Sequence, residues 1–257
     1  MATVLPVNNP VHAPTLVVCH LPAAQANTAT YAALLDTAEQ RRCRRLPTAT
    51  AQARYMVSRA LLRLELAACL GCRPDEVAFT SGEHGKPRLC DGSWHFNLSH
   101  SGEWLALALS PDAELGVDVE SHQRRNRLPA MAQRYFAPLE LQQMEALDER
   151  AWRTRFFHLW TLKEAYTKAL GTSLWFTLSA MSVDLGQAGR AQVRAREDLA
   201  GRLLMWHFPL APAYSLALAM LMPTAGVREM RPQVYRSVPG EYREKLALPA
   251  DISGIAV

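Results

Sequence analysis

Two stretches decide how this chain folds: Gly116-Val117-Asp118-Val119-Glu120 and Trp160-Thr161-Leu162-Lys163-Glu164-Ala165-Tyr166-Thr167-Lys168. The first alternates like a β-strand, so its valines share one face while Asp118 and Glu120 share the other. The second predicts a helix in which Glu164 and Lys168, four residues apart, lie one above the other. Three carboxylates and a lysine on two rigid elements suit a hard cation held against a phosphate, with a base and an acid left for chemistry. The pattern favours a magnesium-dependent transfer site.

The composition is that of a globular protein with a strong preference for arginine. The chain has 257 residues, of which 49% are hydrophobic and 20% charged, which suits one large domain or two modest ones. Its 28 basic residues comprise 24 Arg and only 4 Lys, with clusters at 41–45 and 124–127. Arginine binds planar oxyanions bidentately, so the clusters indicate a phosphate-rich ligand or an acidic partner. A solvated basic surface is the alternative.

The five cysteines follow no disulfide or metal-binding pattern. Cys69 and Cys72 have no second pair at metal-ligand spacing, so we interpret them as buried thiols. No basic segment precedes the short apolar stretch 16–19, and the apolar runs 104–109 and 214–222 are too short to span a bilayer. We therefore expect a soluble, cytoplasmic protein.

Two parts of the chain repeat the same order of elements. Each has a helix-like segment that ends before a glycine, then a strand-like stretch, then a pair of apolar strands. These are 53–70, 79–80, 94–98 and 104–109 in one part, and 151–170, 176–177, 206–210 and 215–220 in the other. The shared order indicates an internal duplication.

We therefore predict an α+β fold of two similar halves, each with one long helix packed on a small, mainly antiparallel sheet. Residues 1–118 would form the N-terminal half, 119–230 the C-terminal half, and 231–257 a tail that wraps over the body. Glu164 lies off the apolar stripe of its helix, so we expect it to face a cleft between the halves. Duplication favours a monomer, because the second half supplies what a partner subunit would provide.

Short polar segments add candidate contacts for an anion. Residues 96–102 (Phe-Asn-Leu-Ser-His-Ser-Gly) predict a turn between two apolar strands, where Ser99 and His100 would offer a hydroxyl and an imidazole to a phosphate. Gly85-Lys86-Pro87 predicts a loop whose lysine reaches an anion. Gly116 has no side chain beside the acids, which would let a ligand approach the backbone.

Four motifs stand in an order that resembles the 4′-phosphopantetheinyl transferases. They are Gly85–Pro87, Phe96–Ser101, Gly116–Glu120 and Trp160–Gly171. Over residues 40–222 the chain is similar to the large, pseudo-dimeric, surfactin-synthetase-activating type. The resemblance implies transfer of phosphopantetheine from coenzyme A (CoA) to a serine of an apo acyl, peptidyl or aryl carrier protein, with release of 3′,5′-ADP. It also implies a pseudo-twofold α/β fold with CoA in the cleft between the halves.

The same resemblance implies roles for individual residues. Asp118, Glu120 and Glu164 resemble the ligands of Mg²⁺, an ion that favours a few carboxylates plus phosphate and water oxygens. Glu164 also resembles the residue that takes the proton of the attacking serine, directly or through a water, and Lys168 resembles the group that stabilises or protonates the leaving 3′,5′-ADP. The residues implied to contact CoA are Lys86, Pro87, Ser99, His100, Asp118, Lys168, Arg45 and Arg54.

An acidic carrier protein would be steered by a basic face near the cleft. The segment after the strand of carboxylates supplies the candidate docking residues, which are Arg124–Arg127, Leu128, Met131 and Phe136. We predict neither a nucleic-acid nor a membrane partner.

Other classes of function compete with this prediction. A magnesium phosphohydrolase or nuclease would use the same carboxylates but would need no carrier protein. A non-catalytic module that binds RNA or another polyanion would need exposed aromatics among its basic residues, whereas most aromatics here lie in apolar strings. A Ser-His-Asp hydrolase built from Ser99, His100 and Asp118 is rejected, because an adjacent Ser and His on a turn do not easily hydrogen-bond as nucleophile and base.

Overall fold

The computed structural model describes residues 12–81, 86–123, 127–172, 181–184, 192–194, 199–224, 230–247 and 255–256. The first part of the chain contains β1 (Thr15–His20), α1 (Leu21–Ala24), α2 (Thr28–Ala32), α3 (Thr37–Arg44), α4 (Ala49–Leu70), β2 (Phe79–Ser81), β3 (Pro87–Leu89), β4 (His95–Ser101) and β5 (Trp104–Ser110). The second part contains β6 (Glu114–Ser121), α5 (Leu128–Tyr135), α6 (Pro138–Met144), α7 (Glu149–Leu170), β7 (Ser182–Asp184), β8 (Gln192–Arg194), β9 (Leu203–Pro209) and β10 (Tyr214–Leu221). The strands β11 (Gln233–Val238), β12 (Tyr242–Lys245) and β13 (Ile255–Ala256) follow.

Helices α4 and α7 are built alike. Each has 22 residues, and each begins at a polar side chain that accepts a backbone N–H: Thr48 from Ala51 at 3.1 Å, and Asp148 from Ala151 at 2.8 Å. Each ends at a glycine in the left-handed region, with φ of 66° and 65°. The predicted pair of glycine-capped helices is therefore confirmed.

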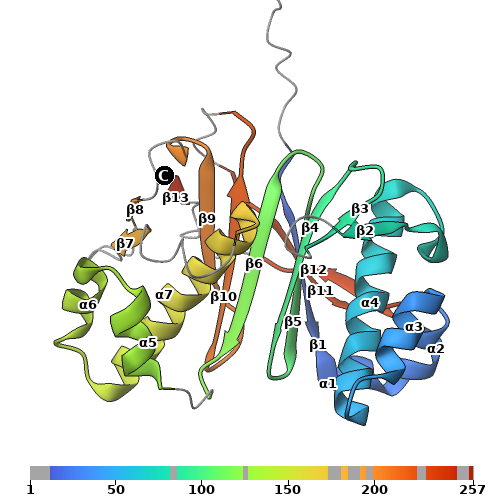
Figure 1. Ribbon diagram of the computed structural model, residues 1–257, viewed down its shortest axis with the longest axis horizontal. Helices are drawn as coiled ribbons and strands as arrows, with labels where there is room; N and C mark the ends of the chain where they lie inside the picture. The colour runs from blue at the N-terminus through green and yellow to red at the C-terminus, as the bar shows by residue number, and fades with distance from the viewer. Residues whose placement is uncertain are drawn as a thin grey trace, which may run out of the picture.

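The two main sheets also repeat one arrangement. The first has the order β12-β11-β1-β5-β4 and the second β13-β9-β10-β6. In each sheet a strand that precedes the long helix (β1 or β6) pairs antiparallel with the second strand of a later hairpin (β5 or β10). The predicted α+β class, with a long helix on a mainly antiparallel sheet in each half, is confirmed (Figure 1).

The core lies in three layers between helices and sheets. One cluster packs α4 on β1 and β5, a second packs α7 and α5 on β9 and β10, and a third lies between the two sheets. Strand β6 shows how the layers divide the side chains: Leu115, Val117 and Val119 belong to the layer between the sheets. Asp118 and Glu120 consequently lie on the opposite face of β6, as the alternation predicts.

The structure bears on two of the predicted boundaries. Strand β6 runs through residues 118 and 119, so a division at that point would cut a strand. Residues 231–257 contain β11, which pairs in parallel with β1 in the first sheet, rather than only wrapping over the body. The strand expected at 176–177 lies outside the described residues. In the described part of the chain, no helix is both long and apolar enough to cross a membrane.

Candidate active site

The two sheets meet where β4 lies beside β6, and side chains join these strands. The backbone N–H groups of β6 donate to side chains of β4: Val117 to Asn97 Oδ1 (2.9 Å), Val119 to Ser99 Oγ (3.4 Å) and Ser121 to Ser101 Oγ (3.0 Å). The strands run parallel, because the residue numbers of both partners rise together. We call this contact, formed by Asn97, Ser99 and Ser101 with residues 117–121, the polar seam.

The polar seam corrects one prediction. Residues 95–101 form β4 rather than a polar turn, and the chain turns at Gly102, whose φ is 55°. A polar residue at every second position is typical of a strand with one polar face, and here that face meets β6.

The carboxylates of β6 are buried against the same serines. Ser99 Oγ donates to Asp118 Oδ1 at 2.9 Å, and Ser101 Oγ donates to Glu120 Oε2 at 3.0 Å. Asp118 is 5% exposed and Glu120 is 8% exposed. Hydrogen bonds to the charged form are what make buried carboxylates tolerable.

Helix α7 brings a cation to this point. Lys168 Nζ donates to Asp118 Oδ1 at 2.7 Å, to Ser99 Oγ at 3.1 Å and to the Val117 carbonyl at 3.1 Å. Glu164 lies one turn earlier on α7 and is partly buried. The structure thus brings Ser99, Asp118 and Lys168 together, with Glu120 and Glu164 on the elements that carry them.

One oxygen in this group fits a cation. Asp118 Oδ2 is buried and has no hydrogen-bond partner among the described residues, and a carboxylate oxygen is the kind of ligand that Mg²⁺ takes. Across the described residues, however, no group of three or more His, Cys, Asp and Glu side chains is arranged to hold a metal ion. The set of Asp118, Glu120 and Glu164 as metal ligands therefore stays a prediction.

Gly116 serves the packing of α7 and not the approach of a ligand. A Cβ at this position would overlap the Ala165 carbonyl oxygen and the Ala169 nitrogen of α7. The missing side chain lets the helix backbone lie directly on β6, which is how Lys168 reaches Asp118. Trp160 is also buried, stacked on Phe156 at a centroid distance of 5.8 Å.

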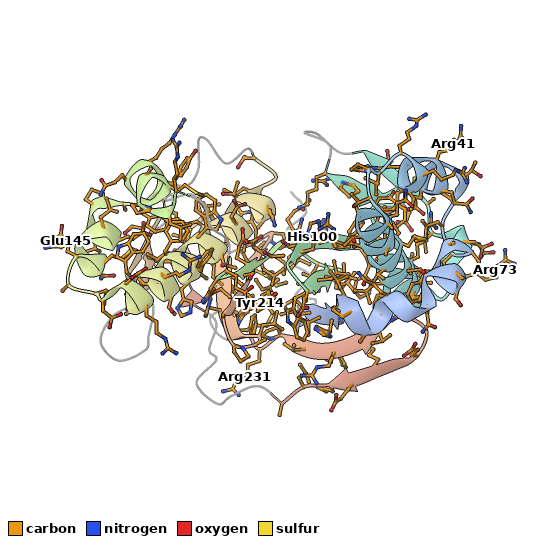
Figure 2. All side chains as sticks on the ribbon, turned by 90° about the horizontal axis from the view of Figure 1, so that it is seen from below. Arg41, Arg73, His100, Glu145, Tyr214 and Arg231 are labelled. Atoms are coloured by element: carbon orange, nitrogen blue, oxygen red, sulfur yellow. The ribbon has the colours of Figure 1, made fainter. Side chains whose placement is uncertain are left out.

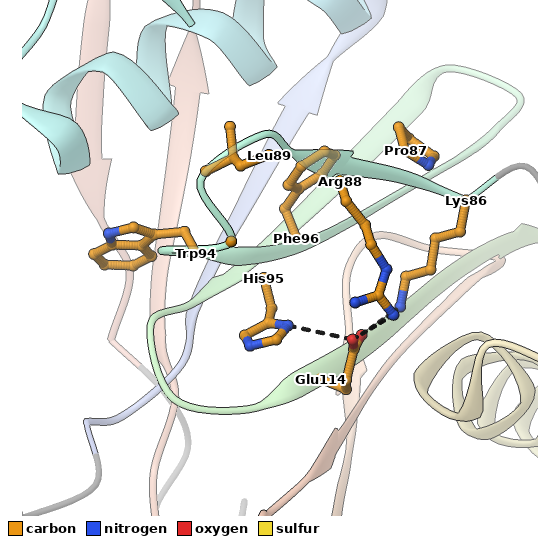
Figure 3. A pocket seen from close by; sticks show the side chains of 9 residues that line it. Lys86, Pro87, Arg88, Leu89, Trp94, His95, Phe96 and Glu114 are labelled. Atoms are coloured by element: carbon orange, nitrogen blue, oxygen red, sulfur yellow. Dashed lines mark hydrogen bonds and ion pairs between the residues drawn. The ribbon is translucent and has the colours of Figure 1, made fainter. Parts of the chain in front are cut away.

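Lys86 binds the protein itself. Its ammonium group donates to Glu114 Oε2 at 2.9 Å and to the carbonyls of Leu115 and Lys168 at 3.1 Å each. An ammonium group has three N–H donors, so none is left for an anion in this arrangement. Figure 3 shows Lys86 and Arg88 on one side of Glu114 and His95 on the other. Burial of the Glu114 carboxylate alone would raise its pKa, but the hydrogen bonds from His95 and Lys86 and the charge of Lys86 lower this pKa to about 2.

A pocket of about 630 Å³ opens on the other face of β4. Among the residues that line it are Asp36, Glu39, Arg42, Arg54, Tyr55, Ser58, Arg59, Phe79, Pro87, Leu98 and His100. Three of the predicted CoA contacts, Arg54, Pro87 and His100, are therefore found here. Arg45 is exposed and does not line the pocket, whereas Arg42 of the same basic run does.

Charge in this pocket is unevenly paired. Glu39 binds both Arg59 and Arg63, and Arg63 also binds Asp36 at 2.7 Å. Neither Arg42 nor Arg54 has an ion-pair partner in the described part of the chain, although Arg42 lies over the ring of Tyr55 at 5.8 Å. The pocket thus keeps positive charge beside two aromatic rings, Tyr55 and Phe79, which suits a phosphorylated nucleotide.

His100 lies near the middle of the molecule, between Arg41 in the first half and Glu145 in the second (Figure 2). Its pKa is lowered by partial desolvation of the ring in the pocket and by the nearby charges of Arg54 and Lys168. The positive charge of Lys168, on one side of β4, thus acts on the imidazole of His100 on the other side.

Some residues of the site carried no clear signal in the sequence. Arg59 and Phe79 line the pocket, with the Arg59 guanidinium 4.6 Å from the centre of the Phe79 ring. Asn97 and Ser101 form the polar seam with Ser99. The period of two in Asn97-Leu98-Ser99-His100-Ser101 is the signal that identifies the latter pair.

Several predicted docking and thiol positions are corrected. Leu128 and Phe136 belong to the core of the second half, and Met131 is partly buried against it. Arg124 and Arg125 lie outside the described residues.

All five cysteines are free, but Cys69 is exposed and Cys72 is only half-buried, so the buried-thiol interpretation is wrong for this pair.

Known proteins share this sequence pattern. Residues 22–112 match the family model "4'-phosphopantetheinyl transferase, N-terminal", and residues 114–219 match that of the "4'-phosphopantetheinyl transferase superfamily". The chain is 38% identical over 148 residues to a provisionally named 4′-phosphopantetheinyl transferase of Synechocystis sp.. That alignment covers 56% of this chain and 60% of the relative's length, which is less than two thirds.

A second relative aligns over more of the chain. The 4′-phosphopantetheinyl transferase Sfp of Bacillus subtilis is 26% identical over 203 residues, which cover 79% of this chain and 89% of the relative. Among solved structures, the chain is similar to a holo-(acyl-carrier-protein) synthase from Bacillus anthracis in complex with CoA (3′,5′-ADP), at 16% identity and a TM-score of 0.39 over 44% of this chain and 99% of that one. On the two family models and the relatives in sequence, the chain belongs to the 4′-phosphopantetheinyl transferase superfamily.

Proposed function

We propose that this chain is an enzyme that transfers 4′-phosphopantetheine from CoA to a serine hydroxyl of an apo carrier protein, in a magnesium-dependent reaction that releases 3′,5′-ADP. One observation supports this most: Asp118 has a buried oxygen without a hydrogen-bond partner in the part of the chain that the structure describes, and its other oxygen lies 2.7 Å from Lys168 Nζ. Both residues lie beside β4, whose other face lines an arginine-containing pocket. The membership in the superfamily and the names of the relatives agree with it.

The pocket would bind the nucleotide end of CoA. Arg42 and Arg54 carry positive charge that no carboxylate among the described residues neutralises, and His100 adds a hydrogen-bonding imidazole at the same wall. Phosphate groups prefer such guanidinium donors, and the rings of Tyr55 and Phe79 offer apolar surface for a base. The pyrophosphate would then extend past the edge of β4 toward Asp118 and Lys168.

The transfer itself would be a displacement at the phosphorus that carries the pantetheine. Asp118, Glu120 and Glu164 would hold Mg²⁺, which when bound neutralises charge on the pyrophosphate. Glu164 would accept the proton of the carrier serine, directly or through a water. The serine oxygen forms the new P–O bond, the pyrophosphate P–O bond breaks, and 3′,5′-ADP leaves with the bonding electron pair. Lys168 would stabilise or protonate that leaving phosphate.

Intact-mass spectrometry of an apo acyl carrier protein tests this proposal. The carrier is incubated with the chain, CoA and Mg²⁺, with and without a chelator, and we expect a gain of one phosphopantetheine that the chelator prevents. Glu164→Gln should abolish the gain while CoA still binds, and Glu244→Gln, at an exposed position of β12, is the matched control. If no acyl, peptidyl or aryl carrier gains mass, the proposed transfer is wrong, and cleavage of a phosphodiester without a carrier would favour the phosphohydrolase.

Finer properties belong to the same proposal. We expect the carrier to belong to fatty-acid, polyketide or peptide synthesis, and the enzyme to act as a monomer in the cytoplasm. Light scattering after size exclusion checks the monomer: a mass near 28.6 kDa is expected, and a doubled mass would contradict it.

A further inference from the structure

We propose that Ser101 is a positioning residue for Glu120, and that the polar seam holds β4 beside β6 so that the serines of β4 reach both β6 carboxylates. The inference rests on the proposed function for its catalytic consequence, but its geometry does not depend on it. It concerns Asn97 and Ser101, two residues of the polar seam for which the family resemblance implies no role.

The hydroxyl of Ser101 has a fixed direction. It accepts the Ser121 N–H at 3.0 Å and donates its own proton to Glu120 Oε2 at 3.0 Å. A hydroxyl carries a single proton, so the bond from the backbone leaves that proton aimed at the carboxylate. Ser101 therefore holds one oxygen of Glu120 in a fixed direction, which orients the whole carboxylate.

Ser99 repeats the arrangement one step earlier but serves more groups. Its hydroxyl accepts the Val119 N–H at 3.4 Å, donates to Asp118 Oδ1 at 2.9 Å and lies 3.1 Å from Lys168 Nζ. Because Ser99 contacts both Asp118 and Lys168, its substitution would change the surroundings of both charges at once. Ser101 contacts Glu120 without touching Lys168, so it isolates the positioning role.

The seam also connects two strands that belong to different sheets. Strands that pair through their backbones lie about 4.8 Å apart, whereas here a serine or asparagine side chain spans the interval. The three N–H groups of β6 would lose their acceptors if these side chains were apolar. The polar residues therefore satisfy the N–H groups of an edge strand through side chains, and the same serines reach the carboxylates of that strand.

The test compares Ser101→Ala, Ser101→Thr and the control Ser110→Ala. Ser110 is a fully buried serine of the neighbouring strand β5, and its hydroxyl accepts the backbone N–H of Asp112. Ser110→Ala therefore measures the structural cost of losing a buried serine hydroxyl that does not hold Glu120. Hydrogen exchange of peptides that span 117–123 reports on the seam, binding of Mn²⁺ by electron paramagnetic resonance reports on the carboxylates, and kcat and KM are measured separately. Thermal melts check that each variant is folded.

We expect Ser101→Ala to speed exchange in β6, weaken Mn²⁺ binding by about tenfold and lower kcat by about tenfold, with the KM for carrier protein unchanged. Ser101→Thr keeps the hydroxyl and should stay within about threefold of the parent protein, as should Ser110→Ala. Unchanged exchange and Mn²⁺ binding in Ser101→Ala would overturn the inference, as would equal losses in both alanine variants. A parent protein that fails to transfer, while Ser101→Ala still loosens β6 and weakens Mn²⁺ binding, would overturn the proposed function and leave the positioning role supported.

Discussion

The molecule has two places where parallel strands meet beside the end of a long helix, and they are built differently. Strands β1 and β11 pair through their backbones from Thr15–Gln233 to Val18–Arg236, a contact that we call the paired seam. Strands β4 and β6 meet through the side chains of the polar seam. The candidate site lies at the polar seam, where the serines of β4 hydrogen-bond to Asp118 and Glu120 of β6.

The residues beside the two seams also differ in polarity. The face of β6 that turns to α7 carries Asp118 and Glu120, whereas Val17 and Cys19 of β1 belong to the core against α4. Seven residues before its terminal glycine, α7 has Glu164 and α4 has Leu64. Leu64 lines a groove of about 290 Å³ whose other wall includes residues 237–241. A duplicated fold therefore provides two equivalent places, and the residue types leave one of them for chemistry.

The largest effect on this contrast is expected from removing the ion pair between Lys168 and Asp118 beside the polar seam, first one charge and then both. Lys168→Met should abolish transfer and lower the free energy of unfolding by about 3 kcal/mol, because Asp118 would keep a buried charge without its partner. The double variant Asp118→Leu/Lys168→Met should recover stability to within about 1 kcal/mol of the parent while remaining inactive. Urea denaturation measures both, and a double variant less stable than Lys168→Met alone would contradict the pairing.

A single methyl group at Gly116 should separate α7 from β6. Gly116→Ala is expected to cost about 2 kcal/mol and to lower transfer at least tenfold, since the helix backbone occupies the space that the Cβ needs. The control is Gly92→Ala, where nothing lies within 4 Å and only the φ of 67° resists, at about 1 kcal/mol and without loss of transfer. Equal activity of the two variants would show that the helix position does not matter.

The second half should also be the acid-sensitive one. Burial, aided by repulsion from the neighbouring histidines, lowers the pKa of His207 to about 3, and burial lowers that of His158 to about 4. The unfolded chain binds these protons near the ordinary pKa of 6.5, so stability is complete above about pH 6.5 and falls as the pH drops toward 4.

Replacing one of these histidines should weaken that dependence. His207→Phe is expected to reduce the loss of unfolding free energy between pH 7 and 5.5 by about 1 kcal/mol. Thermal melts at the two pH values measure it, with His12→Gln, an exposed histidine, as the control. A slope that His207→Phe leaves unchanged would place the acid sensitivity elsewhere.

The smallest effect is expected beside the paired seam, on the neighbouring strand β12. Arg243 forms a half-exposed ion pair with Glu65 at 3.3 Å and lies 3.9 Å from the centre of the Tyr235 ring. Arg243→Ala should therefore cost about 0.5–1 kcal/mol and leave transfer unchanged. A loss of transfer in this variant, measured with the mass assay, would mean that the two seams are coupled.

The sequence predicts most of what is local in this structure. The alternation in residues 115–120 identified a strand with a carboxylate face, and the glycines after Leu70 and Leu170 identified the helix ends. The similar sequences of the two apolar strand pairs, at 94–109 and 206–220, predicted that the two halves contain similar sheets. These features follow from periodicity and backbone preference, which neighbouring residues determine.

What the sequence missed depends on contacts between distant segments. Asn97-x-Ser99-x-Ser101 has the composition of a turn, but the segment pairs with β5 as a strand and its polar side chains meet β6. Gly116 and Lys86 look like places for a ligand, but α7 fills the first and the carbonyls of Leu115 and Lys168 bind the second.

The pairing of β1 with β11 has a consequence for the order in which the protein is made. Residues 15–20 leave the ribosome early, but the strand that covers one edge of β1 lies at 233–238. All the strands from β6 to β10 are translated before it. The half that begins the chain therefore has an open strand edge until the other half has been synthesised, and the nascent chain carries an exposed β1 edge for most of translation.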